Sequence, residues 1–356
     1  MNTLKLGRQT VGLDHPSYFV ADIAANHDGD LERAKLLIRL CAEAGANAAK
    51  FQNLRASKIV SDRGFRSLGG QLSHQSKWNK SVFEVYQDAS LAWDWTPVLK
   101  RECDACGIDY FSSPYDLEAV DMLDPYVELF KIGSGDITWL EMLRKIASKS
   151  KPVLLATGAS ELADVTRAVE EITKINDQLV LMQCNTNYTG SRENFRHIHL
   201  RVLETYHSMF PNVVLGLSDH TPGHATVLGA VTLGARVIEK HFTDDNQRRG
   251  PDHQFSMMPD AWRDMVEHTR ELELALGSPD KFVAENERDT VVVQRRCVRA
   301  ATPLKTGTTL KPEMFEVLRP APSDSVMPYD LPRAVGKRLK ADLAAGEHLY
   351  WAMLSD

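Results

Sequence analysis

The chain has 356 residues and a mass of 39.9 kDa, enough for one large domain and one small domain. Its residues are 43% hydrophobic and 25% charged, as in an ordinary globular enzyme, and its net charge of -6 argues against nucleic acid or an anionic membrane as a partner. No segment resembles a signal peptide or a membrane span, and five scattered cysteines indicate a reduced, cytoplasmic protein.

The predicted elements alternate between short apolar strands and helices. The first strand, residues 18–24, is followed by a helix that Asp30 can cap and Gly45 can end. Further strands are predicted at residues 47–52, 106–114, 126–136, 151–160, 177–188, 213–217 and 236–242. Eight strands spaced by one helix each over about 250 residues predict an α/β fold, a (β/α)8 TIM barrel. A doubly wound open sheet is the alternative, but it rarely repeats the unit so often without a break.

Two regions depart from this repeat. Residues 57–94 are a long polar insert, which we expect to be a loop over the mouth of the barrel. After a helix over residues 260–276 that ends at Gly277, the chain changes to short strands, turns and prolines. We therefore predict a barrel domain at 1–277, a charged linker at 278–290 and a small β-rich domain at 291–356, which is small enough for docking on a partner to matter.

The segment from residue 213 to 256 carries the strongest chemical signal. Its two strands flank a segment of helix length, and this order favours a parallel crossover. His220 and His241 then lie at the carboxyl ends of neighbouring strands, where parallel α/β folds place their chemistry. Two neutral imidazoles that converge there suit a divalent transition metal, although hydrogen-bonded core histidines fit the pattern equally well.

Other strand ends carry cations and histidines. Lys50 and Lys131 end apolar strands, and a buried lysine requires either an anionic ligand or acidic neighbours. Together with nearby hydroxyls and glycine amides, they suit a small anion that bears phosphate and carboxylate. His27 and His253 flank the same mouth as possible ligands or substrate contacts. The remaining histidines of the barrel helices, among them His224 and His268, are predicted to lie on helix surfaces without a specific role.

Read together, these strand ends resemble the sialic acid synthase family, including its legionaminic and pseudaminic acid branches. The matching segments are ADIAANHDGDLERAK, AGANAAKFQ, FSSPYD, FKIGSGDIT, LLATGAS, GLSDHT, IEKHFT and GPDHQFS. The C-terminal RRCV…LKTGTTL…LRPA…VGKRLKADLAAGEHL is similar to the antifreeze-like domain of that family. The resemblance implies a TIM barrel followed by a small β-rich antifreeze-like domain of the β-clip type, in a domain-swapped homodimer.

The resemblance also implies the reaction and the residues that serve it. Phosphoenolpyruvate would condense with the open-chain form of an N-acylmannosamine-like or related aldose, giving a 2-keto-3-deoxy, sialic-acid-like acid and phosphate. Mn²⁺, with Mg²⁺ or Co²⁺ as alternatives, would be held by His220 and His241. The implied catalytic residues are Asp22, Asp136, Lys50 and Lys131. The implied phosphoenolpyruvate-binding residues are Lys50, Ser113, Lys131, Ser134, Ser160, Asn185 and Ser218. The implied sugar-binding residues are Gln52, Tyr188, Asp252 and Arg319, the last reaching into the site of the partner subunit.

The chain departs from the family pattern at Asp22 and Asp136, where the family usually has glutamate. Asp is one methylene shorter, and a shift of about 1 Å in a catalytic group can cost about a hundredfold in rate. NYTG and RPA also replace the usual YP and RPG. These changes bear on which sugar is the substrate more than on the type of reaction. We therefore hypothesise the same phosphoenolpyruvate chemistry on an unusual aldose or N-acyl sugar. A divalent-metal aldolase or hydrolase, or a non-catalytic sugar-binding barrel, are the alternatives.

Overall fold

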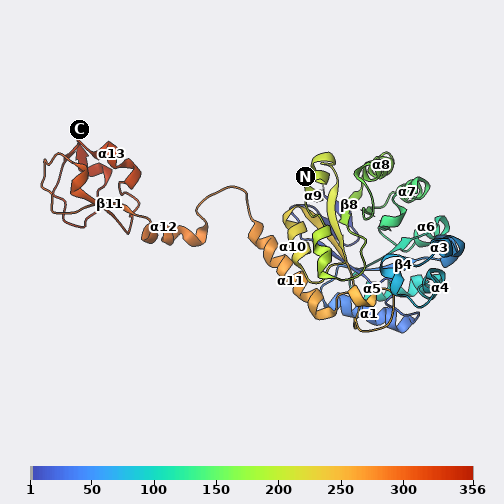
Figure 1. Ribbon diagram of the computed structural model, residues 1–356. Coiled ribbons are helices and arrows are strands. Elements are labelled where there is room, and N and C mark those ends of the chain that lie inside the picture. The colour runs from blue at the N-terminus through green and yellow to red at the C-terminus, as the bar shows by residue number, and fades with distance from the viewer. Residues whose placement is uncertain (1–2, 356) are drawn as a thin grey trace. The chain divides into compact units, whose positions relative to one another are not determined.

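The computed structural model describes residues 3–355 and contains two compact units, Met1–Gly277 and Ser278–Asp356 (Figure 1). The first unit opens with an antiparallel hairpin of β1 (Leu4–Leu6) and β2 (Gln9–Val11). Among the described residues, no helix is both long enough and apolar enough to cross a membrane.

Eight parallel strands form the centre of the first unit. They are β3 (Tyr18–Asp22), β4 (Ala48–Asn53), β5 (Asp109–Pro114), β6 (Phe130–Ile132), β7 (Val153–Ala156), β8 (Leu179–Cys184), β9 (Val214–Asp219) and β10 (Ala235–His241). Their hydrogen-bonded order is β5-β4-β3-β10-β9-β8-β7-β6, and β5 lies beside β6 without a ladder between them. Every residue of β3, β9 and β10 is buried, because a parallel sheet is covered on both faces. The prediction of a (β/α)8 barrel is confirmed.

The helices form a ring around these strands (Figure 1). They are α1 (Leu31–Glu43), α5 (Thr96–Ala105), α6 (Leu117–Leu123), α7 (Leu140–Ala147), α8 (Leu162–Thr173), α9 (Val202–Met209), α10 (Ala225–Thr232) and α11 (Pro259–Leu276). As the sequence predicts, the Asp30 carboxylate accepts hydrogen bonds from the first backbone amides of α1, and Gly45 follows that helix with a φ of 93°.

A close approach between β9 and β10 fixes the strand pair that carries the two histidines. A Cβ atom on Gly216 would lie 2.7 Å from the Val237 carbonyl oxygen, so only glycine fits there. The register between these strands shifts between Ala235 and Val237. The shift sets the alignment of the last strand, which places His241 at the level of the end of β9.

The insert differs from the sequence-based expectation, because it folds into short helices instead of a loop. These are α2 (Ala56–Ile59), α3 (Asp62–Ser67), η1 (Ser73–Lys77), α4 (Val82–Asp88) and η2 (Trp93–Trp95). Ser61 caps α3, and Ser81 with Glu84 forms a capping box on α4. The helices were missed because they bury few residues and therefore show no apolar periodicity.

The predicted strand at 126–136 is also too long, since β6 covers only Phe130–Ile132. The chain then turns through η3 (Ser134–Asp136), where the Asp136 amide donates to the Gly133 carbonyl at 3.0 Å. This turn directs the serine and the carboxylate to positions beyond the strand end.

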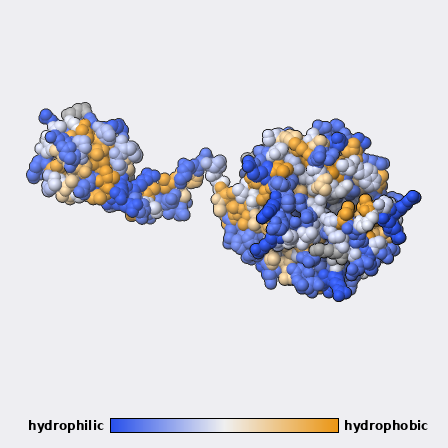
Figure 2. All heavy atoms as spheres, in the orientation of Figure 1, coloured by the Kyte–Doolittle hydropathy of each residue, from blue (hydrophilic) through white to orange (hydrophobic). Residues whose placement is uncertain are grey.

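The second unit is small and rich in short strands. It contains η6 (Glu285–Glu287), α12 (Arg288–Gln294), β11 (Cys297–Ala300), η7 (Pro312–Met314), β12 (Phe315–Leu318), η8 (Pro328–Asp330), α13 (Leu331–Ala334), β13 (Arg338–Leu339), η9 (Trp351–Met353) and β14 (Leu354–Ser355). Strand β11 pairs antiparallel with β12, and β13 with β14, around a core that includes Val298, Val326 and Leu349. Helix α12 begins inside the segment that we predicted to be a linker. Figure 2 shows hydrophobic side chains at the surface of this helix, which exposes Val292 and Val293.

Candidate active site

The carboxyl ends of the barrel strands surround a cavity of about 160 Å³. Because parallel strands all end at the same face of the barrel, residues far apart in the sequence meet there. Ten of the predicted site residues line this cavity: Asp22, Lys50, Gln52, Lys131, Ser134, Tyr188, Ser218, His220, His241 and Asp252.

Four buried charged residues, Asp22, Lys50, Lys131 and Glu239, form the base of the cavity, and we call them the strand-end cluster. Glu239 Oε1 lies 2.6 Å from Lys131 Nζ and 3.1 Å from Lys50 Nζ. Lys50 Nζ also lies 2.7 Å from Asp22 Oδ2. Two ammonium groups and two carboxylates therefore balance, which is how the protein tolerates two buried lysines.

The pKa values of the cluster reflect this pairing. Burial acts to raise the pKa of Glu239, but Lys131 and Lys50 outweigh burial and hold that pKa well below its usual range. Burial lowers the pKa of Lys131, with Glu239 opposing the shift. Burial raises the pKa of Asp22, against the effect of Lys50. Glu239 Oε2 has no hydrogen-bond partner in the described part of the chain, so one oxygen of this carboxylate is available to a ligand.

His220 and His241 lie side by side above the strand-end cluster, with ring centroids 5.4 Å apart. Burial lowers the pKa of each to about 3, so both imidazoles are neutral near pH 7. His220 Nδ1 lies 2.9 Å from the Asn185 carbonyl oxygen, which can only accept, so Nδ1 carries the proton and Nε2 keeps its lone pair. His241 Nε2 lies 3.4 Å from Asp22 Oδ2.

This donor set fits a divalent transition metal. Two neutral imidazoles supply nitrogen lone pairs, and a backbone carbonyl orients one ring in the way that metal-bound histidines usually require. Asp22 adds a nearby carboxylate, and His241 Nδ1 is buried without a hydrogen-bond partner among residues 3–355.

Two further carboxylates lie at or near the cavity in an unusual protonation range. Burial raises the pKa of Asp252 to about 7, against a hydrogen bond from the Ala25 amide at 3.1 Å. Burial also raises the pKa of Asp136 to about 6. Both groups can therefore exchange a proton close to neutral pH.

Five of the predicted site residues do not line the cavity: Ser113, Asp136, Ser160, Asn185 and Arg319. The Asn185 side chain donates to the His197 carbonyl, so only its backbone, through His220, contributes to the site. Ser160 donates to the Gly158 carbonyl, and Ser113 Oγ is buried. Arg319 is exposed in the second unit, where Nε donates to the Gln294 carbonyl.

His27 and His253 have structural partners. His27 Nδ1 accepts a hydrogen bond from the Gly29 amide at 3.0 Å, and the ring packs edge-on against Trp95. His253 is fully buried between Thr243 Oγ1, at 2.8 Å, and Asp28 Oδ1, at 2.9 Å. Neither lines the cavity, so their position beside the mouth reflects loop packing.

The insert supplies an aromatic wall that the sequence alone does not reveal. His74, Trp78 and Tyr86, which we call the insert wall, line the same cavity as the strand-end cluster. The Tyr188 ring joins the two sides, because its centroid lies 4.8 Å from that of His74 and 4.3 Å from that of His220. A larger cleft of about 1230 Å³ shares His74, Trp78 and Tyr188 with the cavity and continues outward from it.

Tyr115 and Glu239 also line the cavity, and the sequence assigned neither of them a role. The Tyr115 hydroxyl has no hydrogen-bond partner among the described residues, and burial followed by the charges of Asp136 and Asp22 raises its pKa. Tyr115 stands one residue after β5, and Glu239 stands two before His241. A search for every polar residue at strand ends finds both, but it does not distinguish them from residues that face the helices.

The fold and the cavity define a (β/α)8 barrel enzyme with a buried lysine, carboxylate and imidazole cluster at its strand ends. The chain belongs to the NeuB family, which matches residues 37–281, and residues 295–355 match the SAF domain. The family is one of sialic-acid-like synthases, and the family resemblance seen in the sequence is confirmed.

Relatives and solved structures agree with this assignment. The chain is 32% identical to the N,N'-diacetyllegionaminic acid synthase of Legionella pneumophila, over 94% of this chain and 93% of the relative. It is 32% identical to the N-acetylneuraminate-9-phosphate synthase of Homo sapiens, over 92% and 90%. A crystal structure of N-acetylneuraminic acid synthetase from Leptospira borgpetersenii, in complex with citrate, superposes with a TM-score of 0.71 at 26% identity, over 82% of this chain and 95% of that chain.

Proposed function

We propose that the protein condenses phosphoenolpyruvate with the aldehyde of an open-chain aldose or N-acyl amino sugar, giving a 2-keto-3-deoxy acid and phosphate. The observation that carries the proposal is the buried lysine pair around Glu239, which faces two neutral imidazoles in one cavity. The ammonium groups suit the phosphate and carboxylate of phosphoenolpyruvate, and the imidazoles suit a metal ion that polarises the sugar aldehyde, so the reaction requires both kinds of group side by side.

Lys50 and Lys131 bind the anionic donor in this proposal. Phosphoenolpyruvate brings a phosphate and a carboxylate, and these replace part of the contact that both ammonium groups make with Glu239. Ser134 and Ser218 line the same cavity. The Ser218 hydroxyl donates to Glu239 Oε1 at 3.2 Å, and it would turn from that carboxylate to phosphoenolpyruvate when the anion binds. The Gly158 amide donates to Ser134 Oγ at 2.9 Å, which leaves the serine proton free to donate to the donor.

His220 and His241 would hold the metal ion, with Asp22 beside them, and Mn²⁺ is our proposal for its identity. When bound, such an ion supplies Lewis-acid polarisation of the aldehyde oxygen. The neutral state of both rings matters because a protonated imidazole has no lone pair to offer. Burial below the insert wall also keeps bulk water away from this position.

The remaining steps need a proton acceptor. C3 of phosphoenolpyruvate bonds to the aldehyde carbon, water adds at C2, and the adduct collapses to the 2-keto acid as the C–O bond to phosphate breaks. Of the two protons of the water, one ends on the former aldehyde oxygen as a hydroxyl and the other leaves with phosphate. We propose that Asp136 takes the proton of the attacking water, since a pKa of about 6 suits a base near neutral pH. Asp136 itself does not line the cavity, but it lies close enough to Tyr115, which does, for its charge to help raise the pKa of the Tyr115 hydroxyl.

The sugar extends from the cavity into the outer cleft. A cavity of about 160 Å³ is smaller than the roughly 300 Å³ that ligand pockets usually offer, so it cannot hold both substrates. Gln52, Tyr188 and Asp252 would meet the reacting end of the sugar. The insert wall would then contact the distal carbons and the N-acyl group, and thereby select the sugar.

We also propose that residues 1–277 form the synthase domain, and that residues 291–356 dock on a second copy of the chain. Exposed hydrophobic residues accompany this part of the chain, among them Phe282, Val293 and Tyr329. Arg319 would then act in the site of the partner subunit. Mixing inactive Arg319→Ala and Lys131→Met chains tests this, because swapped dimers should regain activity that neither variant has alone. A mixture that stays inactive would count against exchange of the domain.

The reaction itself is tested with metal-loaded protein, phosphoenolpyruvate and a panel of aldoses and N-acyl amino sugars. We expect phosphate release and a new 2-keto acid, detected by mass, for at least one sugar. The Lys131→Met variant is the control for contaminating phosphatase. Release of phosphate without a new acid, or no turnover with any sugar, would refute the proposal.

A further inference from the structure

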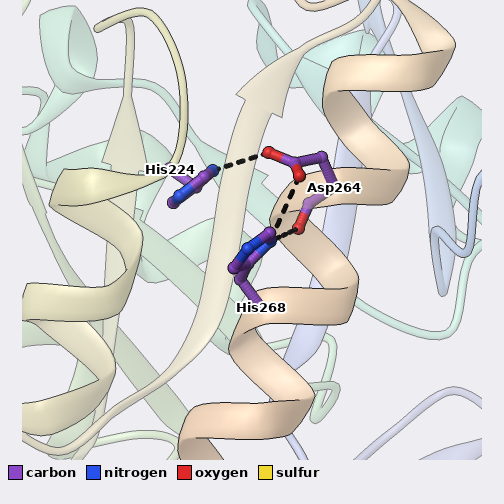
Figure 3. A group of neighbouring side chains, drawn as sticks. All are labelled: His224, Asp264 and His268. Carbon is purple, nitrogen blue, oxygen red and sulfur yellow. Dashed lines mark hydrogen bonds and ion pairs between the residues drawn. The ribbon is translucent and has the colours of Figure 1, made fainter.

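His224, Asp264 and His268 gather on the outer side of the first unit, away from the cavity (Figure 3). His224 immediately precedes α10, whereas Asp264 and His268 lie one turn apart on α11. His224 Nδ1 lies 2.9 Å from Asp264 Oδ2, and His268 Nδ1 lies 3.2 Å from Asp264 Oδ1. The two rings are stacked, with centroids 4.7 Å apart and an interplanar angle of 11°.

The three residues lie close enough together for one metal ion to reach a donor atom of each. One ligand atom from each residue lies within 4.8 Å of the other two. His268 Nδ1 also lies 2.8 Å from the Asp264 backbone carbonyl oxygen, which can only accept, so Nδ1 carries the proton and this ring would offer Nε2 to the ion. Both imidazoles are partly exposed, so their side chains have room to rotate and bring one nitrogen of each ring toward an ion beside the Asp264 carboxylate.

The chemistry of the group favours a borderline transition ion. Two imidazoles and one carboxylate are typical zinc ligands, whereas magnesium and calcium prefer oxygen donors throughout. The carboxylates of Glu267 and Glu271 lie close enough to act electrostatically on His268, and their negative charge also favours a cation. Nε2 of His224 and of His268 takes no hydrogen bond among the described residues, so each ring can offer a second nitrogen.

We propose that His224, Asp264 and His268 bind Zn²⁺ or a similar divalent transition ion, with water in the fourth position. The site joins the start of α10 to the middle of α11, two helices that are separated by β10 in the sequence. Zinc would therefore stabilise the folded first unit, by an amount that grows with the logarithm of the zinc concentration once this exceeds Kd. The site takes no part in the proposed reaction.

The test uses the full-length chain without a histidine tag, stripped with EDTA and titrated with ZnCl₂ by calorimetry and by metal analysis after dialysis. The double variant His220→Asn/His241→Asn removes the inner pair and should retain about one zinc per chain. Adding His224→Asn/His268→Asn should abolish that binding. The matched control is His197→Asn/His207→Asn, which removes two exposed histidines elsewhere and should leave zinc binding unchanged.

Two measurements decide the result: the number of zinc ions bound per chain and the loss of zinc binding in the variants. If the inner-pair variant does not fold by circular dichroism, the comparison is made in the otherwise unchanged chain, where His224→Asn/His268→Asn should remove one zinc and the zinc-dependent rise in Tm. MgCl₂ at the same concentrations should raise Tm equally little in both proteins. Equal zinc binding with and without His224 and His268 would overturn the proposal, whatever the enzyme assay shows.

Discussion

The strand-end cluster and the insert wall line one cavity, but they are built in different ways. The strand-end cluster sits on parallel barrel strands, and its two lysines balance its two carboxylates through contacts of 2.6, 2.7 and 3.1 Å. His74 lies in η1, a short 3-10 helix without a side-chain cap, and Trp78 directly follows it; both residues are only partly buried. A rigid, charge-balanced side suits the reacting atoms, and a side made of neutral aromatic rings suits the choice of sugar.

This contrast predicts that changes to the strand-end cluster alter turnover, whereas changes to the insert wall alter recognition of the sugar. Tyr188 contacts both sides through His220 and His74, so it is the residue where the two effects should mix.

The largest effect is expected from Lys131→Met. The variant removes one of two cations that meet the donor anion and leaves Glu239 with Lys50 alone. We expect kcat/KM for phosphoenolpyruvate to fall by about a thousandfold, as for loss of a preorganised charged donor. Phosphate release, with the sugar saturating and phosphoenolpyruvate varied, measures this kcat/KM. A value within threefold of that of the unchanged protein would contradict the assigned role.

Glu239→Gln should have the largest effect on stability. Among the described residues, it leaves the two buried ammonium groups with Asp22 as their only carboxylate within 4.0 Å. Breaking such a buried arrangement costs about 3–5 kcal/mol in the free energy of unfolding, which urea denaturation measures. Asp88→Asn, which breaks the exposed contact with Lys80, is the matched control and should leave the unfolding midpoint unchanged.

Asp252→Asn should change how stability depends on pH. An unfolded aspartate titrates near 4, whereas Asp252 titrates at about 7, so the folded chain binds one more proton between these values. Its contribution to the free energy of unfolding therefore falls as the pH rises from about 4 to about 7. The variant should remove about 1–2 kcal/mol of this decline, since water in the cavity weakens the full shift. Urea titrations at both ends of the range test it, and an unchanged slope would refute it.

The smallest effect is expected from His74→Ala. Loss of its ring contacts with Tyr188 and Trp78 removes about 0.5–1.5 kcal/mol. The KM for the sugar should therefore rise by about two- to tenfold, with the KM for phosphoenolpyruvate unchanged. Steady-state kinetics with each substrate varied in turn separate the two. A rise in the KM for phosphoenolpyruvate alone would show that the insert wall faces the donor instead.

The sequence by itself determined the eight strands and the meeting of Lys50, Lys131, His220 and His241, because apolar strands in parallel order must end at one face of a barrel. The tertiary structure alone decided three other features. Glu239 became the common partner of both lysines, the polar insert became helices that wall the cavity, and His224 met His268 across two helices. Each depends on contacts between residues far apart in the chain, and neither hydrophobic periodicity nor the order of strands and helices specifies which side chains will touch.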